Sequence, residues 1–522
     1  MVSEKRKGSK KQAVTRKKLK VENQENSLPE VDKTRKEVNK YYSKIISKDT
    51  TNKPKVIEKA LKLIGNDLYS ASRKHDLCRV IQACLKHGND QQKAHILECL
   101  TEDYGKLAAG KYSFFLAKKL LKIGNKEELM EKVLPQAKAM LASPNGIKFL
   151  DLLYSDGNYK NKLMKSIYAP EIEEQTGHLE EIIKNHPEIE NDLKSSLHKT
   201  VRHALNKGLI EYSIVQHVVC EYTQIIEKDQ KLEILGQLWD HLASLMNSKP
   251  GVRLAIEALA ASDIKQRKKI VKLAQPLINL ISDDESNAYL FFIKLFEVID
   301  DTKRINKILS STIVQNMKEI IKSKNGVKVL LYIIPANLDL FILSQSEIDF
   351  LKDDLNTLSK KDLNQKKKEI FLNISQPIID EITESLETMI KNPRLSNLVV
   401  AVAIILSQGL IKAPKLTSAI CKFVINWDIM DDNISHRALK KIIVLENKNG
   451  NKKFAGRMLK NLKEREDYVE KLIKSRGVWV FESLATSNIK EEAQEFFRKY
   501  QDKLEKSHTG EKALFEALTQ SN

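Results

Sequence analysis

Glycine, proline and cysteine are scarce in this chain of 522 residues, which contains 18 Gly, 12 Pro and five Cys. With 42% hydrophobic residues the chain can bury a large core, and its many Leu, Ile, Lys and Glu residues favour helix over strand. The five cysteines are scattered, odd in number and form no CxxC pair. This pattern excludes a disulfide framework and a zinc site, and it indicates a reducing compartment.

Segments that mark secretion, membrane insertion or common enzyme sites are also missing. The N-terminus has no apolar signal region, and no run of about 18 uncharged apolar residues occurs. Neither GxGxxG, GxxxxGK[ST], HExxH, GxSxG nor an EF-hand loop is present. His508-Thr-Gly-Glu-Lys512 resembles a zinc-finger linker, but no cysteine lies near it. We therefore expect a soluble, intracellular protein that is not an enzyme and has no cofactor or metal.

Positive charge is in excess and unevenly distributed. The net charge is +19, and residues 1–20 contribute +8, from nine Lys or Arg against Glu4. The other 502 residues therefore carry +11. A basic body with a more basic end indicates a polyanionic partner, with nucleic acid favoured over membrane. The alternative is a surface whose charge only keeps the protein in solution.

The first 45 residues are polar, charged and poor in aromatic side chains, which predicts a disordered tail. Two clusters of cations in this tail are typical of a nuclear localisation signal, although a plain electrostatic arm would have the same composition. The predicted signal residues are Lys5, Arg6, Lys7, Lys10, Lys11, Arg16, Lys17, Lys18 and Lys20.

From about residue 55 onward the sequence is helical and repeats itself. Segments 76–88 and 112–124 share their apolar positions, and each ends in a glycine followed by Asn. A glycine there predicts a left-handed helix C-cap, and the Asn suits a turn into another helix. Several copies begin with a turn signal: Asn145-Gly146, Pro250-Gly251, Asn325-Gly326 and Arg476-Gly477.

One template fits nine segments of the chain. The residue six positions after its first position is apolar or aromatic in all nine, and the spacings of 36, 33, 69, 36, 37, 38, 109 and 42 are near multiples of 36. The two large gaps leave room for divergent repeats near residues 178–200 and between 340 and 410. The first positions are Cys78, Phe114, Ile147, Gln216, Val252, Tyr289, Val327, His436 and Val478.

Repeats of this kind cannot bury their apolar faces alone, but stacked copies share a continuous core. The sequence therefore predicts an all-α protein, an α-solenoid of about eleven repeats of roughly 36 residues. We expect four parts: the basic tail over 1–45, N-terminal repeats over 46–210, middle repeats over 211–345 and C-terminal repeats over 346–522.

Several longer segments carry a resemblance to a known family. They are Arg79-Val-Ile-Gln82 with Lys86-His-Gly88, Lys111-Tyr-Ser113 with Lys118-Lys119, Ile299-Asp-Asp-Thr-Lys303, Lys328-Val-Leu-Leu-Tyr332, and Ser359-Lys-Lys-Asp362 with Lys366-Lys-Lys-Glu369 and Ile374-Ser375. On these segments the chain resembles the Pumilio (PUF) repeat family over about residues 60–510. The closest resemblance is to its nucleolar, Penguin-type branch, which ends in a CPL region. The resemblance implies three-helix repeats and a nucleolar protein of large ribosomal subunit assembly that engages pre-rRNA.

PUF repeats read one base per repeat through their second helix, and the resemblance assigns this to the first, second and fifth template positions. Cys78, Arg79 and Gln82 form a set that resembles an adenine reader. In most other copies these positions hold aliphatic side chains, as at Ile147 and Val252, which cannot bond to a base edge. One bidentate contact gives only about 1–3 kcal/mol of discrimination. The sequence therefore predicts little base specificity.

Cations recur at the same template positions. The second position is cationic in five of nine copies and holds His217 in a sixth, and Lys118 and Lys440 add cations at the fifth. In one register they would follow a phosphate backbone; the alternative is that they only solvate each helix. The predicted RNA-binding residues are Cys78, Arg79, Gln82, Lys118, Lys148, His217, Arg253, Lys328, His436, Arg437 and Lys440.

Two aromatic residues and one basic stretch leave alternatives open. Phe115 and Trp479 hold the second position, where they would stack on a base or pack between repeats. The lysines of residues 360–368 would contact RNA from a loop or solvate a helix face.

The sequence thus predicts a nuclear, nucleolar RNA-binding protein that holds structured RNA through its backbone and shape. The expected partners are pre-rRNA, mRNA as a second RNA, DNA bound without specificity, and pre-ribosomal proteins, with no membrane. The alternative is a protein-binding scaffold of the HEAT or armadillo kind, whose repeats of about 40–47 residues differ from the register found here.

Overall fold

The computed structural model describes residues 29–172, 176–336, 343–353, 355–356, 358–505 and 507–519, and every regular element in these ranges is a helix. The all-α prediction is confirmed. The chain divides into two compact units: unit 1 ends at Ile226 and unit 2 begins at Glu227. None of the described helices is long and apolar enough to cross a bilayer. The expected divisions at residues 210 and 345 stay predictions.

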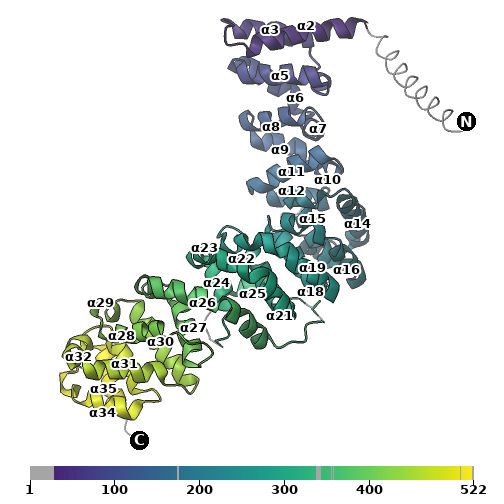
Figure 1. Cartoon of the computed structure of the whole chain (residues 1–522). Coiled ribbons are helices and arrows are strands. Elements are labelled where there is room, and N and C mark those ends of the chain that lie inside the picture. The colour runs from purple at the N-terminus through teal and green to yellow at the C-terminus, as the bar shows by residue number, and fades with distance from the viewer. Residues whose placement is uncertain are drawn as a thin grey trace, which may run out of the picture. The chain divides into compact units, whose positions relative to one another are not determined.

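Unit 1 is a stack of short helices that runs from α2 and α3 at one end to α15 at the other (Figure 1). Helices α5, α8, α11 and α15 follow one another as neighbours along the stack, and we call them the inner helices of unit 1. The elements are α2 (Pro29–Ile46), α3 (Lys53–Ile64), α4 (Leu68–Ser72), α5 (His75–His87), α6 (Asp90–Thr101), α7 (Tyr104–Ala109), α8 (Phe114–Ile123), α9 (Lys126–Val133), η1 (Leu134–Gln136), α10 (Ala137–Met140), α11 (Pro144–Asp156), α12 (Lys160–Tyr168), α13 (Leu179–Asn185), η2 (Pro187–Ile189), α14 (Glu190–Asn206), η3 (Leu209–Glu211) and α15 (Ser213–Ile225).

Unit 2 is built in the same way, with α18, α20, α24, α27, α30, α33 and α35 as successive neighbours, its inner helices. The elements are α16 (Lys228–Gly236), η4 (Trp239–His241), α17 (Leu242–Leu245), α18 (Lys249–Ala261), α19 (Ile264–Ala274), η5 (Gln275–Ser282), α20 (Ala288–Val298), α21 (Thr302–Ile305), η6 (Asn306–Ser310), α22 (Ser311–Gln315), α23 (Met317–Lys322), α24 (Lys324–Ile333), α25 (Gln345–Leu351), α26 (Leu363–Ile390), α27 (Leu395–Ser407), α28 (Pro414–Lys422), η7 (Phe423–Ile425), α29 (Trp427–Met430), α30 (Ser435–Lys448), α31 (Lys453–Glu464), α32 (Glu466–Ile473), α33 (Val478–Ala485), α34 (Lys490–Arg498), η8 (Gln501–Lys503) and α35 (Thr509–Thr519).

The repeat template predicted from the sequence coincides with the inner helices. All nine first positions lie in nine different inner helices. The residue six positions later is buried in every case, from Cys84 in α5 to Leu484 in α33. Helix α27 lies between α24 and α30 and supplies a divergent repeat in the gap expected between 340 and 410.

The other expected repeat, near residues 178–200, contributes no inner helix. Helix α11 packs directly on α15, and the Asp151 carboxylate accepts a hydrogen bond from the Ile214 amide at 3.0 Å. Residues 179–206 instead form α13 and α14, whose apolar side chains pack against α15. The apolar spacing of this segment reflects that packing and not a position in the inner series.

The glycines that follow the first two inner helices do not adopt the left-handed conformation that we expected. Gly88 and Gly124 have φ of −72° and −87° in extended backbone. A Cβ on Gly88 would lie 2.7 Å from the Cys84 carbonyl oxygen, and one on Gly124 would lie 2.9 Å from a leucine methyl group. Close approach therefore explains these glycines. The Asn residues after them do begin helices, since Asn89 and Asn125 cap α6 and α9.

Three inner helices begin with the same arrangement, Ser-x-x-Gly. The serine hydroxyl accepts a hydrogen bond from the glycine amide at 2.9 Å in α11, 3.0 Å in α18 and 2.7 Å in α24. Three of the four glycines of the predicted turn signals thus lie in the first turn of a helix, and the fourth, Gly477, is the residue before α33. In α24 a Cβ on Gly326 would lie 2.0 Å from the Ile320 carbonyl oxygen, because the helix starts against the backbone of α23.

Helix α2 occupies residues that we assigned to the tail. Val38 and Ile45 are buried, and the helix packs on α3 and α5. Val38, Tyr42 and Ile45 are spaced four and three residues apart, which places them on one helical face. The polar composition of the segment concealed this short apolar stripe. The predicted nuclear localisation residues, from Lys5 to Lys20, lie outside the described residues.

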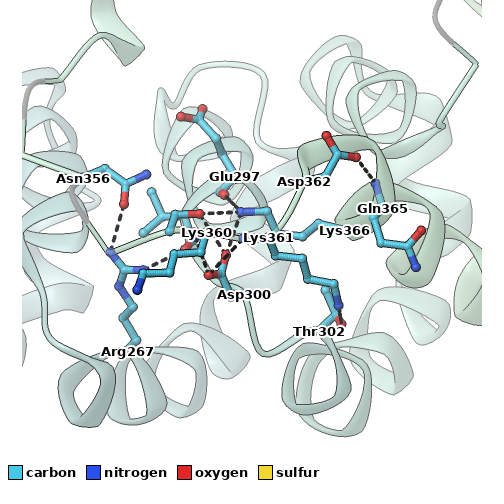
Figure 2. A network of polar contacts seen from close by, with 12 residues as sticks. Arg267, Glu297, Asp300, Thr302, Asn356, Lys360, Lys361, Asp362, Gln365 and Lys366 are labelled. Atoms are coloured by element: carbon cyan, nitrogen blue, oxygen red, sulfur yellow. Dashed lines mark hydrogen bonds and ion pairs between the residues drawn. The ribbon is translucent and has the colours of Figure 1, made fainter.

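The segment between α25 and α26 is attached to unit 2 through Asp300 (Figure 2). Its carboxylate accepts hydrogen bonds from the Ser359 hydroxyl at 2.8 Å, the Lys360 amide at 2.8 Å and the Lys366 ammonium at 3.0 Å. On the other side of this segment, Arg267 donates to the Asn356 side chain at 3.0 Å. The network fixes where the chain enters α26.

This network joins sequence motifs that are far apart in the chain. Residues 299–303, 359–362 and 366–369, three of the segments that carry the family resemblance, meet around Asp300. Lys366 is 2% exposed. Neither interpretation of the basic stretch therefore holds for Lys366, which is an internal ion-pair partner.

We predict that Gly326→Ala destabilises the protein by roughly 2 kcal/mol, because the new methyl group overlaps the Ile320 carbonyl and forces α23 and α24 apart. Urea unfolding of the full chain measures the effect. Gly456→Ala in α31 is the matched control: nothing lies within 4 Å of its Cβ, so it should be neutral or stabilising by up to about 1 kcal/mol. Equal stabilities of the two variants would contradict the close packing of α24.

We predict that Asp300→Asn costs roughly 3 kcal/mol at neutral pH, since it removes the anion that faces buried Lys366. Partial burial raises the pKa of Asp300, but hydrogen bonds from Lys360, Lys366 and Ser359 outweigh it and lower the pKa from 3.8 to about 2. A depressed carboxyl pKa stabilises the fold above the unfolded-state value, so the difference between wild type and variant should shrink as pH falls from about 4 towards 2. Asp301→Asn, an exposed N-cap next door, is the control.

Candidate nucleic-acid interface

Four side chains on three adjacent inner helices of unit 1 form what we call the unit-1 row: Arg79 on α5, Phe115 and Lys118 on α8, and Lys148 on α11. All four are exposed. Arg79, Phe115 and Lys148 hold the same template position on neighbouring helices, and Lys118 lies one turn after Phe115 on the same face. The structure thus brings together the cations that the sequence predicted in this part of the chain.

The two lysines of the unit-1 row have no carboxylate partner among the described residues. Asp151, one turn after Lys148 on α11, caps α15 through the Ile214 amide instead of pairing with the lysine. Arg79 contacts a tyrosine and no carboxylate in the described ranges: its guanidinium lies 4.9 Å from the Tyr42 ring centroid and donates to the Tyr42 hydroxyl at 3.2 Å. These contacts orient the guanidinium without neutralising it.

Phe115 is exposed on the surface of α8. Its side chain is 60% exposed and contacts the Phe114 ring edge-on at a centroid distance of 5.3 Å. Of the two interpretations left open by the sequence, packing between repeats is wrong for this residue. The exposed phenyl ring is accessible to a planar ligand.

The predicted base-reading residues Cys78, Arg79 and Gln82 of α5 do not all face a ligand. Cys78 is 1% exposed, and its thiol donates to the Tyr112 carbonyl at 3.2 Å. Burial raises the pKa of this thiol. The Gln82 amide points back and donates to the Cys78 sulfur at 3.4 Å. At this repeat Arg79 is the predicted residue that the fold exposes.

His217 on α15 belongs to the core of unit 1. Its Nδ1 lies 2.8 Å from the Tyr154 hydroxyl and its Nε2 lies 3.1 Å from the Glu221 carboxylate. His178 binds the same carboxylate at 3.1 Å. Burial raises the pKa of Glu221, but the bonds from His217 and His178 outweigh it and lower the pKa. His217 therefore links α11 to α15 and does not face solvent.

In unit 2 the predicted cations are mostly paired within the protein. Arg253 on α18 donates to Glu257 at 2.8 Å and to the Phe350 carbonyl at 2.6 Å. Lys328 on α24 pairs with Glu347 and lies 5.5 Å from the Tyr289 ring centroid.

The C-terminal candidates differ among themselves. Lys440 on α30 pairs with Glu482 at 3.0 Å and lies 4.8 Å from the Trp479 ring, so that the indole is partly covered. His436 is 5% exposed, and its Nδ1 lies 2.6 Å from the Asp432 carbonyl. Burial lowers the pKa of His436. Arg437 is exposed.

The carboxylates that pair with the predicted cations of unit 2 were not predicted from the sequence. Glu257 lies four residues after Arg253 on one helix, a spacing at which an ion pair is expected and could have been read from the sequence. Glu482 and Glu347 lie 42 and 19 residues from their lysine partners. Lys440 and Glu482 both hold the fifth template position on the neighbouring helices α30 and α33, so the register could have indicated this pair. Glu347 lies outside the register, which gives no indication of its pair with Lys328.

Comparison with known proteins finds relatives with Pumilio repeats and a CPL domain, in agreement with the helical repeats of the structure. A sequence profile of the CPL (NUC119) domain matches residues 322–466. Pumilio homolog 3 of Homo sapiens is 24% identical over 66% of this chain and 54% of its own length. The chain is a Pumilio-like protein with a CPL region.

Other relatives extend the similarity over most of this Pumilio-like chain. Pumilio homology domain family member 6 of Schizosaccharomyces pombe is 23% identical over 89% of the chain and 76% of the relative. The crystal structure of human Puf-A has a TM-score of 0.72 at 21% identity and covers 93% of this chain and all of that one. Puf-A in complex with DNA gives 0.70 at 22% identity, over 93% and 99%. The chain spans about half the length of the first curated relatives that it matches.

We predict that Arg253→Met destabilises the Pumilio-like chain by about 2 kcal/mol, because the Glu257 carboxylate, which is 1% exposed, loses one of its cations. The ion pair of Glu257 with Lys231 at 3.1 Å stays in place and limits the loss. Lys148→Met, which removes an exposed cation without an ion pair, should change stability by less than about 0.5 kcal/mol. Thermal unfolding of both variants checks the assignment. Equal changes in stability of the Arg253→Met and Lys148→Met variants would contradict an internal role for Arg253.

Proposed function

We propose that the chain binds RNA along unit 1, through the unit-1 row, by contacts to phosphate groups and by stacking. The observation that supports this is the recurrence of exposed side chains, two of them lysines without a carboxylate partner in the described ranges, at one register on three adjacent helices. Unpaired cations in register attract a polyanion, since neutralising phosphates releases counterions from the nucleic acid.

Little base specificity is expected from these groups. An ammonium group bonds to phosphate oxygens whatever the base, and a phenyl ring stacks on any base for about 1–3 kcal/mol. The side chains that would read base edges in this unit are turned inward: Cys78 and Ile147 are buried, and Gln82 bonds to Cys78. The role proposed is therefore binding by shape and charge, without a catalytic step.

The proposed setting is the nucleolus, where the chain would engage pre-rRNA during large ribosomal subunit assembly, with translational control of mRNA as a second role. Support comes from the basic residues 1–20 and from the resemblance to the nucleolar branch of the family. Human Puf-A has been crystallised with DNA, which is in keeping with a protein of this fold that contacts the phosphate backbone.

We predict that Lys118→Glu/Lys148→Glu weakens binding to single-stranded RNA at least about tenfold, and to a similar extent for unrelated sequences. The slope of log affinity against log salt should fall by about 1.4, at roughly 0.7 per phosphate contact. Electrophoretic mobility shift and salt titration with two RNAs of different sequence measure both quantities. Crosslinking and sequencing of bound RNA in cells should then enrich pre-rRNA for the wild type and much less for the variant.

Lys162→Glu/Lys199→Glu is the matched control, because it changes the charge of unit 1 equally at exposed positions on α12 and α14. Equal losses in the two double variants would mean that only net charge matters, and the unit-1 row would be the wrong surface. No shift at moderate salt with any RNA would favour the protein-binding scaffold instead.

A further inference from the structure

Helix α25 lies against the inner helices α18 and α20 of unit 2. Its Glu347 carboxylate binds Lys328 on α24 and the Tyr289 hydroxyl on α20. Its last turn presents the Phe350 carbonyl to Arg253 on α18, at 2.6 Å. The two unit-2 cations in the register of Arg79 and Lys148 are thus both engaged by α25.

The segment that makes these contacts is acidic. Residues 344–353 contain Glu347, Asp349 and Asp353 against Lys352, a net charge of −2. Carboxylate and carbonyl oxygens of the segment occupy donors of Arg253 and Lys328 that phosphate oxygens of a nucleic acid would otherwise accept from. Helix α25 thus contacts Arg253 and Lys328 through oxygen acceptors, as the phosphate groups of a nucleic acid would.

The two ends of this segment are held very differently. At the C-terminal end Asp353 pairs with Lys294, and both side chains are below 5% exposed. Leu351 and Leu355 are also buried there. Before Leu351 the helix is held mainly by the polar contacts of Glu347 and of the Phe350 carbonyl, and the Phe350 ring lies 5.7 Å from the Lys249 ammonium. Ile348 is 42% exposed. Release of α25 from α18 and α20 would therefore break these contacts and leave the buried C-terminal attachment in place.

Glu347 is the residue on which the N-terminal attachment depends. Besides Lys328 and Tyr289 it accepts hydrogen bonds from the amide and hydroxyl of Ser344, at 2.6 and 2.9 Å, and so completes the capping box of α25. One carboxylate therefore holds the helix to unit 2 and starts the helix itself. Its two oxygens accept all four hydrogen bonds at once, two on each oxygen.

We propose that α25 is an intramolecular competitor of nucleic acid: it closes a second backbone-binding surface at Arg253 and Lys328, which opens when α25 is released. This inference rests on the proposed function of the unit-1 row. It assigns RNA contact in the resting protein to unit 1 and reserves unit 2 for RNA that displaces α25.

The test uses the full chain in the Lys118→Glu/Lys148→Glu background, where binding through unit 1 is reduced, and a single-stranded homopolymeric RNA as the probe. Glu347→Ala should raise affinity roughly fivefold by freeing Lys328 and uncapping α25. Asp349→Ala is the matched control, since it removes the same charge from the same helix, and within the described ranges the Asp349 side chain bonds to Gln345 and Lys352 of α25 and its end, not to another inner helix. Glu347→Ala/Lys328→Ala should lose the gain, because the freed cation is gone.

Equal affinities of the Glu347→Ala and Asp349→Ala variants would overturn the proposal, as would a gain that survives Lys328→Ala. Hydrogen exchange of the wild-type chain gives a second measurement: amides of residues 345–351 should exchange faster with saturating RNA, and unchanged exchange would contradict release. Equal binding by the wild type and by Lys118→Glu/Lys148→Glu would instead contradict the proposed function. In that case Glu347→Ala compared with Asp349→Ala in the wild-type background still tests α25.

Discussion

Burial of apolar side chains between successive inner helices is the interaction on which both units depend. A single helix of 8 to 14 residues, the length range of these elements, is marginal in water. Packing between two neighbours makes each one stable, and α20 carries this furthest, with ten of its eleven residues buried. What remains open on an inner helix is a narrow strip, and side chains such as Arg79 and Lys148 lie there because the rest of the helix is covered.

In both units this exposed strip holds side chains at the same template positions, but the groups that lie next to them differ. In unit 1 nothing in the described ranges lies over Lys118 and Lys148. In unit 2 three of the four corresponding cations meet carboxylates: Arg253 meets Glu257 of the same helix, Lys440 meets Glu482 of the next inner helix and Lys328 meets Glu347 of α25, whereas Arg437 is exposed. A repeat sequence therefore fixes where a side chain projects, while the segments between repeats decide whether it faces solvent, another helix or a ligand.

Periodicity alone was enough to predict nine of the eleven inner helices, because the buried residue six positions into each template holds the repeat together, as Cys84 and Leu484 illustrate. It did not predict α35, and the repeat expected near residues 178–200 supplies no inner helix. The exposure of Arg79, Phe115 and Lys148 follows from the same register. The pairing of Lys328 could not be predicted, since Glu347 lies in an insertion outside the register. Glycine roles were misjudged for a related reason: Gly88 is needed where two pieces of backbone approach, and such contacts leave no pattern in one sequence.

The unpaired lysines on α8 and α11 have a further consequence for the protein without ligand. Like charges at one register on adjacent helices repel one another, so unit 1 is destabilised by the same groups that would attract RNA. Dissolved ions screen that repulsion. Rising ionic strength should therefore strengthen the empty unit 1 while it weakens the complex, and the ion pairs of unit 2 should respond in the opposite direction.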